Sequence, residues 1–162
     1  MVIIMDFPVP MRRRNRLQDY DYSQGGTYYV TICAQYKKCL FGYVIDGTDG
    51  PIMQVNELGR IVEAHIRAIS DRYPTIEVVR ACVMPNHVHL LLFFDPEKTH
   101  PALSTVINQF KGAASKSAGK PLWQKGYYDH VIRDEAEYRQ IGSYIEHNAA
   151  KWKSDDYYTA AL

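Results

Sequence analysis

The stretch IEVVRACVMPNHVHLLLFF, residues 76–94, decides the fold, because it holds two apolar runs separated by a Pro-Asn pair. Both runs, 76–84 and 87–94, are rich in the β-branched and large apolar residues that favour strands. Pro85 and Asn86 are typical of a break between regular elements. We therefore predict two successive core strands, the second of which begins at His87.

Further strands and helices are predicted on both sides of this pair. Strand runs are recognised by β-branched and aromatic residues, and helices by apolar residues at helical spacing that follow a capping residue. The other predicted elements are a strand over 27–35, two short strands within 40–55, a helix from Asn56 to about Arg72, a helix from about Ala102 to Ser117, a strand over 127–133, and a helix from Asp134 to about Lys153.

This order of elements predicts an α+β fold, a ferredoxin-like βαββαβ sandwich with an antiparallel sheet. The two short strands within 40–55 are expected to form an inserted β-hairpin, and the last helix is additional to the basic pattern. The fold hosts many unrelated functions and therefore names none of them.

Composition describes a single soluble domain of ordinary character. The 162 residues are 46% hydrophobic and 23% charged, and three cysteines without CxxC spacing indicate neither a disulfide framework nor a structural zinc site. No run reaches membrane-spanning length, so we expect a cytoplasmic protein without a membrane partner. The net charge is only +1, yet basic residues gather at Arg12, Arg13 and Arg14 and recur at Lys111 and Lys116.

His87 and His89 are the first candidate functional residues. On a strand, side chains at positions i and i+2 point to the same face, so the two imidazoles lie side by side, as a metal site requires. Two polar rings in the apolar run HVHLLLFF need a reason to be there. The other interpretation is a pair of histidines satisfied by hydrogen bonds alone.

The last predicted helix supplies a second candidate pair. Tyr144 and Asn148 are four residues apart and share one helix face. If this helix packs over the histidines, Asn148 reaches the metal and Tyr144 points at a bound phosphate. Tyrosine is an accepted covalent nucleophile. By spacing alone, however, in a chain with 13 tyrosines, the favoured interpretation of Tyr144 is a core aromatic of an amphipathic helix.

The motif MPNHVHLLL (84–92) resembles the histidine–hydrophobic–histidine motif of the IS200-like single-tyrosine transposases. The flanking sequence resembles the REP-associated tyrosine transposase branch. The resemblance extends over nearly the whole chain, through four further blocks in the same order: RRRNRLQDYDYSQGGTYYVTICAQYKKCLFGYV (12–44), NELGRIV (56–62), INQFKGAASK (107–116) and WQKGYYDHVIRDEAEYRQIGSYIEHNAAKW (123–152).

The resemblance implies a metal-dependent nuclease that cleaves single-stranded DNA near a hairpin and forms a 5′-phosphotyrosine intermediate. It implies Tyr144 as the nucleophile, with Tyr138 as the second choice, and His87, His89 and Asn148 as ligands of a divalent ion, Mg²⁺ or Mn²⁺. The family commonly has Asn-Pro after this tyrosine, whereas this chain has Asn148-Ala149, so we expect the helix to continue towards Trp152.

The implied partner is single-stranded or hairpin DNA, and the candidate contacts are Arg12, Arg13, Arg14, Lys111 and Lys116. The domain division expected is a basic arm over 1–26, one catalytic domain over 27–153, and a tail over 154–162. Relatives that exchange helices act as homodimers, while the REP-associated branch is expected to act as a monomer in cis.

Three rival functions remain at this stage. A nucleic-acid-binding module would keep the basic and aromatic residues without needing His87, Tyr144 and Asn148 to converge. A metal-dependent hydrolase would use water and an acidic base, for which Glu135 or Glu146 would have to serve. A domesticated protein would bind its DNA but cut poorly.

Overall fold

The structure, a computed structural model, describes residues 25–160. The predicted arm, with Arg12, Arg13 and Arg14, lies outside these residues. Strands and helices follow one another as β1 (Gly26–Cys33), β2 (Gly42–Gly47), β3 (Gly50–Val55), α1 (Glu57–Arg72), β4 (Ile76–Met84), β5 (His87–Phe94), α2 (Leu103–Ala118), β6 (Tyr128–Val131) and α3 (Glu135–Glu146), with short 3₁₀ helices η1 (Gln35–Lys37) and η2 (Ala149–Ser154).

The predicted α+β fold is confirmed. Four strands form one sheet in the order β4-β5-β1-β6, and every neighbouring pair is antiparallel. The hairpin β2–β3 forms a separate two-stranded sheet. Asn56 and Asp134 cap α1 and α3 as predicted, each accepting a hydrogen bond from the backbone N–H three residues later.

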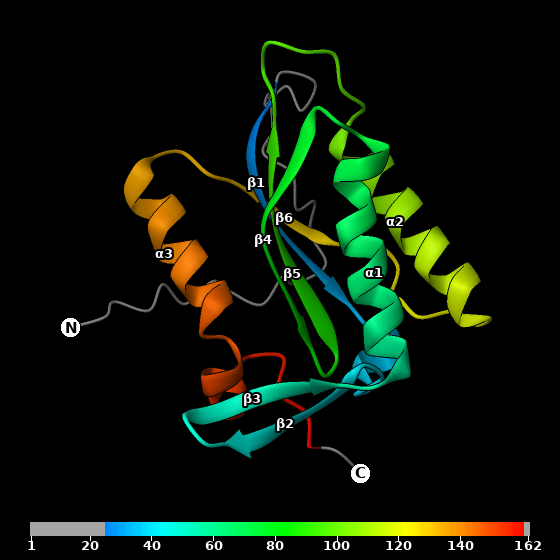
Figure 1. Cartoon of the computed structure of the whole chain (residues 1–162), viewed down its shortest axis with the longest axis vertical. Helices are drawn as coiled ribbons and strands as arrows, with labels where there is room; N and C mark the ends of the chain where they lie inside the picture. Colours follow the sequence, from blue (N-terminus) through cyan, green and yellow to red (C-terminus); the bar gives the residue numbers. More distant parts are fainter. Residues whose placement is uncertain (1–24, 161–162) are drawn as a thin grey trace.

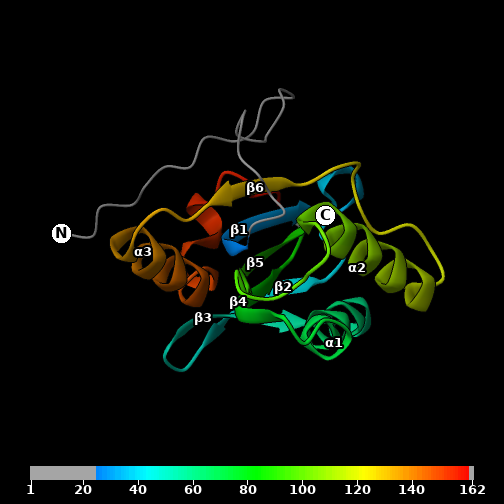
Figure 2. The ribbon, with the colours of Figure 1, turned by 90° about the horizontal axis from the view of Figure 1, so that it is seen from above.

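Two apolar layers lie on opposite faces of the sheet. Helices α1 and α2 cover one face, and α3 covers the other (Figures 1 and 2). On β5 the alternation of side chains sends Val88, Leu90 and Leu92 towards α1 and α2, whereas Leu91 packs under α3 with Ile141 and Ile145. His87 and His89 share the parity of Leu91, so the β5 pattern places both on the α3 face.

The predicted end of the last helix is wrong. Helix α3 ends at Glu146, with His147 as its C-cap, and the chain continues as the 3₁₀ helix η2 rather than as α-helix to Lys153. The Ser143 carbonyl accepts from the His147 backbone N–H at 3.0 Å and also lies 2.8 Å from the His147 imidazole Nδ1, so both groups of the C-cap residue close the last turn of α3. The tighter winding that follows buries Trp152.

Gly59 is required by a close approach between α1 and the chain before β2. A Cβ at this position would lie 2.3 Å from the Phe41 carbonyl oxygen, whereas a Cβ at Gly112 in α2 would meet nothing within 4 Å. Gly59→Ala is expected to lower the free energy of unfolding by roughly 1–3 kcal/mol through overpacking. The matched change Gly112→Ala should raise it by up to about 1 kcal/mol, because alanine is the better helix former. Urea denaturation measures both, and equal effects would refute the close approach.

Candidate metal and nucleophile site

His87 and His89 face each other beneath α3. Both imidazoles are buried, and their Nε2 atoms are 3.0 Å apart. Strand pairing sets His89 between Thr31 on β1 and Cys82 on β4. The side-by-side arrangement expected from the i, i+2 spacing is therefore present.

Hydrogen bonds hold each imidazole by its other nitrogen. The Asn86 amide nitrogen donates to the Tyr157 carbonyl, 2.7 Å away, which leaves the Asn86 Oδ1 to accept from His87 Nδ1–H at 2.8 Å. His89 Nδ1 lies 2.8 Å from the Tyr29 hydroxyl and 2.9 Å from the Thr31 hydroxyl. Because Nδ1 of His87 carries the proton, its Nε2 keeps a free lone pair, as a metal ligand must.

Burial keeps both imidazoles neutral. It holds the pKa of His87 well below its usual range, with the neighbouring His89 adding to the effect, and it lowers the pKa of His89 to about 3. Neutral imidazole is the form that binds metal ions, so the site needs no deprotonation at neutral pH.

Tyr144 of α3 lies over this pair. Its ring centroid is 5.5 Å from that of His89, and its hydroxyl donates to Asp155 at 3.3 Å. Burial and then the Asp155 carboxylate raise the pKa of Tyr144 well above its usual value, while Asn148 opposes them. The Lys151 ammonium lies 5.8 Å from the centre of the Tyr144 ring. The phenol is thus protonated and is placed beside the imidazoles.

Asp155 and Asn148 complete the polar groups around the histidines. Ligand atoms of His87, His89 and Asp155 all lie within 4.8 Å of one another. Asn148 is buried, and neither polar atom of its side chain has a hydrogen-bond partner among residues 25–160. An orphaned buried amide is costly unless something polar satisfies it. Two imidazoles, a carboxylate and this amide form a donor set that fits a divalent metal ion.

Sequence reasoning missed Asn86, Asp155 and Tyr157. The Tyr157 ring lies 4.7 Å from that of His87, and its backbone N–H donates to Asp155. Asp155 and Tyr157 both belong to the predicted tail over 154–162, which the structure places against the site. The run DDYY at 155–158 joins acidic and aromatic residues, but no helical or strand period connects it to the histidines. Of these three residues, only Asn86 stands in a recognisable sequence context, because it lies between Pro85 and His87.

The remaining predicted residues lie elsewhere. Tyr138 packs against the apolar cluster of Leu91, Ile141 and Ile145. Lys111 and Lys116 belong to α2, on the opposite face of the sheet from α3 (Figure 2). The Lys111 ammonium donates to the carbonyls of Gln124 and Gly126, both at 2.8 Å, whereas Lys116 is exposed.

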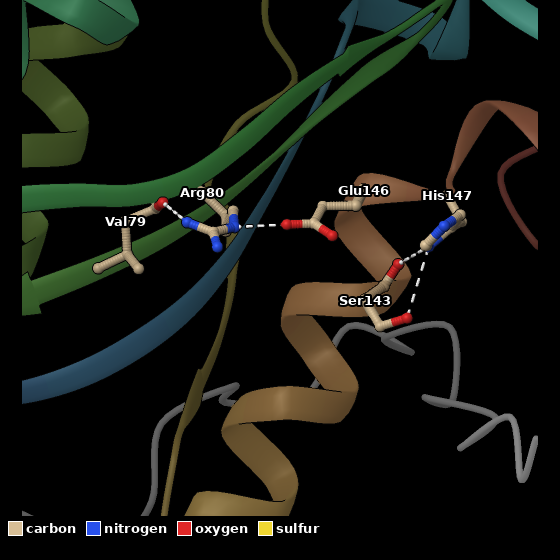
Figure 3. Close-up of polar contacts among 5 residues, drawn as sticks. All are labelled: Val79, Arg80, Ser143, Glu146 and His147. Atoms are coloured by element: carbon tan, nitrogen blue, oxygen red, sulfur yellow. Dashed lines mark hydrogen bonds and ion pairs between the residues drawn. The ribbon is translucent and has the colours of Figure 1, made fainter.

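A β-bulge aims Arg80 of β4 at the helix that carries Tyr144. Strand pairing slips between Val78 and Arg80, which changes the face on which the following side chains lie. Arg80 Nε then donates to Glu146 at 2.7 Å while its Nη1 donates to the Val79 carbonyl (Figure 3). The pair therefore ties the last turn of α3 to the edge of the sheet.

Arg80→Ala is expected to lower the free energy of unfolding by less than about 1 kcal/mol, because both partners of this ion pair are half-exposed. The double change Arg80→Glu with Glu146→Arg should recover part of the loss. Urea denaturation at low and high salt provides the measurement. Arg139→Ala removes the still more exposed pair with Glu135 and is the control. A loss above about 2 kcal/mol would contradict a surface ion pair.

The paired imidazoles lie on a sheet strand, and a helix that carries a tyrosine packs over them, which is the arrangement that the resemblance to the IS200-like transposases implies. The sequence profile described as "Transposase IS200 like" matches residues 51–148, a range that includes both histidines, Tyr144 and Asn148. The chain belongs to this family of IS200-like transposases.

Two proteins of Haemophilus influenzae match most of the chain. The chain is 32% identical over 171 residues to an uncharacterised protein of Haemophilus influenzae, with 91% of this chain and 93% of the relative covered. It is 24% identical over 144 residues to a putative REP-associated tyrosine transposase of the same organism, with 81% of this chain and 74% of the relative covered.

Two solved structures share the fold. A REP-associated tyrosine transposase bound to a REP hairpin superposes with a TM-score of 0.63 at 20% identity, covering 88% of this chain and 74% of that one. A putative transposase from Deinococcus radiodurans gives 0.50 at 23% identity, covering 83% and 98%. Among residues 25–160, no helix is both long and apolar enough to span a membrane.

Proposed function

We propose that this protein is a metal-dependent single-stranded DNA endonuclease and strand transferase, with Tyr144 as its nucleophile. The observation that carries the proposal is that side chains from β5, from α3 and from the segment after η2 lie close together in one site. Helix α3 brings Tyr144 to the His87–His89 pair, and the segment after η2 brings Asp155 to both. A core aromatic would not need to point its hydroxyl at a half-buried carboxylate beside two imidazoles.

The chain's own residues prepare the nucleophile. Asp155 accepts the hydrogen bond of the Tyr144 hydroxyl, so the lone pairs of the phenol oxygen remain available for a phosphorus atom. In the proposed reaction a bond forms between this oxygen and phosphorus, and the bond from phosphorus to the 3′ oxygen breaks. The phenolic proton leaves along the Asp155 hydrogen bond, and the departing oxygen takes up a proton as a free 3′-hydroxyl. Rejoining is the reverse attack by a 3′-hydroxyl.

His87, His89 and Asn148 are the proposed ligands of a divalent ion, and Asp155 adds a carboxylate to them. When bound, such an ion polarises phosphate oxygens and stabilises the charge that develops on them. The mixed nitrogen and oxygen donors suit Mn²⁺ or Mg²⁺, of which Mn²⁺ accepts imidazole more readily. Asn86 and the hydroxyls of Tyr29 and Thr31 fix the direction of the two rings.

The proposed substrate is single-stranded DNA at or near a hairpin, as in the REP-bound relative that shares this fold. His87, His89 and Tyr144 all come from one chain, which supports an active site formed in cis and a catalytically complete monomer. Arg12, Arg13, Arg14 and Lys116 remain proposed phosphate contacts. Lys111 is a weaker one, because two of its three donors already bind carbonyl oxygens.

The test is a covalent adduct. The protein is incubated with Mn²⁺ and hairpin oligonucleotides flanked by randomised single strands, labelled at either the 5′ or the 3′ end. We expect an adduct that survives denaturing electrophoresis and carries only the 3′ label, because the tyrosine retains the 5′ phosphate. An adduct that carries the 5′ label would overturn the stated polarity. Hairpin binding without any adduct, in Mn²⁺ or in Mg²⁺, would favour a non-catalytic or domesticated binding protein.

A further inference from the structure

The turn Gln35–Lys38, between β1 and β2, holds two non-glycine residues in the left-handed region. Tyr36 has φ 57° and Lys37 has φ 52°. Residues with a side chain rarely adopt this conformation, because it is sterically unfavourable for them. A bulky aromatic in this position is a genuine outlier, and strain of this kind gathers at functional sites.

Hydrogen bonds from three directions hold the backbone of this turn in place. The Gln35 N–H donates to the Leu122 carbonyl at 2.8 Å. The Lys37 carbonyl accepts from the Asn86 amide at 3.3 Å and from the Thr159 hydroxyl at 3.2 Å. None of these bonds uses the Tyr36 side chain, which is 76% exposed. The turn is therefore rigid, and it presents an aromatic ring to solvent.

Two lysine ammonium groups of this turn lie close to aromatic rings. The Lys38 ammonium lies 5.8 Å from the centre of the Tyr36 ring, and the Lys37 ammonium lies 5.9 Å from that of Tyr157. An exposed tyrosine alone needs no explanation. A rigid exposed ring with the Lys38 ammonium beside it has the chemistry that single-stranded nucleic acids require, which is a face for a base and charge for its phosphate.

The turn is connected directly to the histidine site. Asn86 bonds the Lys37 carbonyl with its amide nitrogen and His87 with its amide oxygen. The Tyr157 ring lies between the Lys37 ammonium and the His87 ring, at 5.9 Å and 4.7 Å respectively. The backbone of the turn that carries Tyr36 is therefore bonded to the residue that precedes and orients His87.

We propose that Tyr36 is a stacking platform for an unpaired nucleotide that flanks the scissile phosphate, with Lys38 as the contact to that nucleotide's own phosphate. This inference rests on the proposed function for the position of the nucleotide in the strand. The ligand class is single-stranded DNA, recognised by base stacking and charge with little preference for one base. The strained backbone exists because the ring must project from a turn anchored at Asn86.

The first test measures affinity for single strands. Fluorescein-labelled dT16 is titrated with the full-length protein and followed by fluorescence anisotropy. Removal of one stacked base contact weakens binding by roughly 5- to 150-fold, which is the change expected for Tyr36→Ala. Tyr36→Phe keeps the aromatic face and should bind as the parent does. Tyr43→Ala removes another exposed tyrosine, on β2, and is the matched control expected to have no effect.

A second test does not depend on any variant folding. A dT16 strand with 5-iododeoxyuridine in place of thymidine crosslinks to stacked aromatic side chains on irradiation. Peptide mapping of the parent protein should find the crosslink at Tyr36.

A salt titration tests the phosphate contact separately. Lys38→Gln should lower the slope of log K against log salt concentration by about 0.7, the value for one phosphate contact on a single strand. A crosslink elsewhere, or unchanged affinity of a folded Tyr36→Ala variant, overturns the platform.

Failure of the platform and failure of the proposed function have different signatures. If Tyr36→Ala binds dT16 as tightly as the parent while the parent still forms the covalent adduct, the platform is wrong and the nuclease stands. If the parent forms no adduct but Tyr36→Ala loses dT16 affinity, the platform stands as a binding site without the proposed chemistry. With both correct, Tyr36→Ala raises the DNA concentration needed for half-maximal cleavage, while the rate at saturating DNA stays close to that of the parent.

Discussion

Tyr144→Phe is expected to abolish the covalent protein–DNA adduct while leaving the protein folded and able to bind DNA. The change removes only the oxygen that attacks phosphorus, so cleavage should fall to the uncatalysed background. The ring keeps its packing beside His89, and the hydrogen bond to Asp155 that is lost is long, at 3.3 Å. Loss of one such bond costs about 1 kcal/mol of stability. Denaturing electrophoresis of Mn²⁺ reactions measures the adduct, and urea denaturation measures the fold.

Tyr138→Phe is the matched control for this prediction. Tyr138 lies on the same helix but packs into the apolar cluster around Ile141 and Leu91. The hydroxyl that donates to Asp155 is that of Tyr144. The control should form the adduct at the parent's rate. Retention of the adduct by Tyr144→Phe and its loss in Tyr138→Phe would transfer the nucleophile assignment to the second candidate.

The fold followed from the sequence because its signals are local and agree with one another. The apolar runs at 76–84 and 87–94 became β4 and β5 within their predicted bounds, and Asn56 and Asp134 cap their helices. The end of α3 did not follow, because helical spacing of apolar residues continues past Glu146. The His147 side chain bond to Ser143 and the burial of Trp152 depend on contacts that no period shows.

The candidate site was predictable where it follows a period and hidden where it depends on tertiary contacts. The side-by-side placement of His87 and His89 follows from the strand period. The shared helix face predicted for Tyr144 and Asn148 does not hold, because α3 ends at Glu146 and Asn148 is the N-cap of η2. Asp155, a residue of the predicted tail, is the C-cap of η2, and its carboxylate lies within 4.8 Å of ligand atoms of both histidines, a tertiary contact that no sequence period indicates. Arg80 faces α3 because of a β-bulge, a backbone irregularity without a sequence signal here.

The hydrogen bonds of Asn86 set the direction of the buried His87 ring. Asn86 links three parts of the chain, because its amide bonds the turn at Lys37, the carbonyl of Tyr157 and the ring of His87. A buried amide with all of its partners in place orients the groups around it and makes their geometry unique. The direction of the His87 ring is therefore set by residues far apart in sequence.

His87→Ala is expected to abolish both Mn²⁺ binding and adduct formation. The change removes one of two imidazole ligands and also leaves the Asn86 Oδ1 without its donor. Electron paramagnetic resonance of free Mn²⁺ gives a reading of metal affinity that does not depend on cleavage. His65→Ala is the matched control, because His65 lies on α1 and bonds Ser117 on the other face of the sheet. It should bind Mn²⁺ and form the adduct as the parent does.

Two further changes complete this experiment by separating the ligands from the residues that orient them. Asn86→Ala keeps both imidazoles but frees the His87 ring, and loss of such an outer partner typically weakens metal binding by roughly 10- to 100-fold. Asp155→Asn keeps the shape of the side chain but removes its charge, so it should weaken Mn²⁺ binding if the carboxylate belongs to the donor set. Unchanged Mn²⁺ affinity in His87→Ala would refute the metal centre. Unchanged affinity in Asp155→Asn alone would leave Asn148 as the third ligand and restrict Asp155 to holding the Tyr144 hydroxyl.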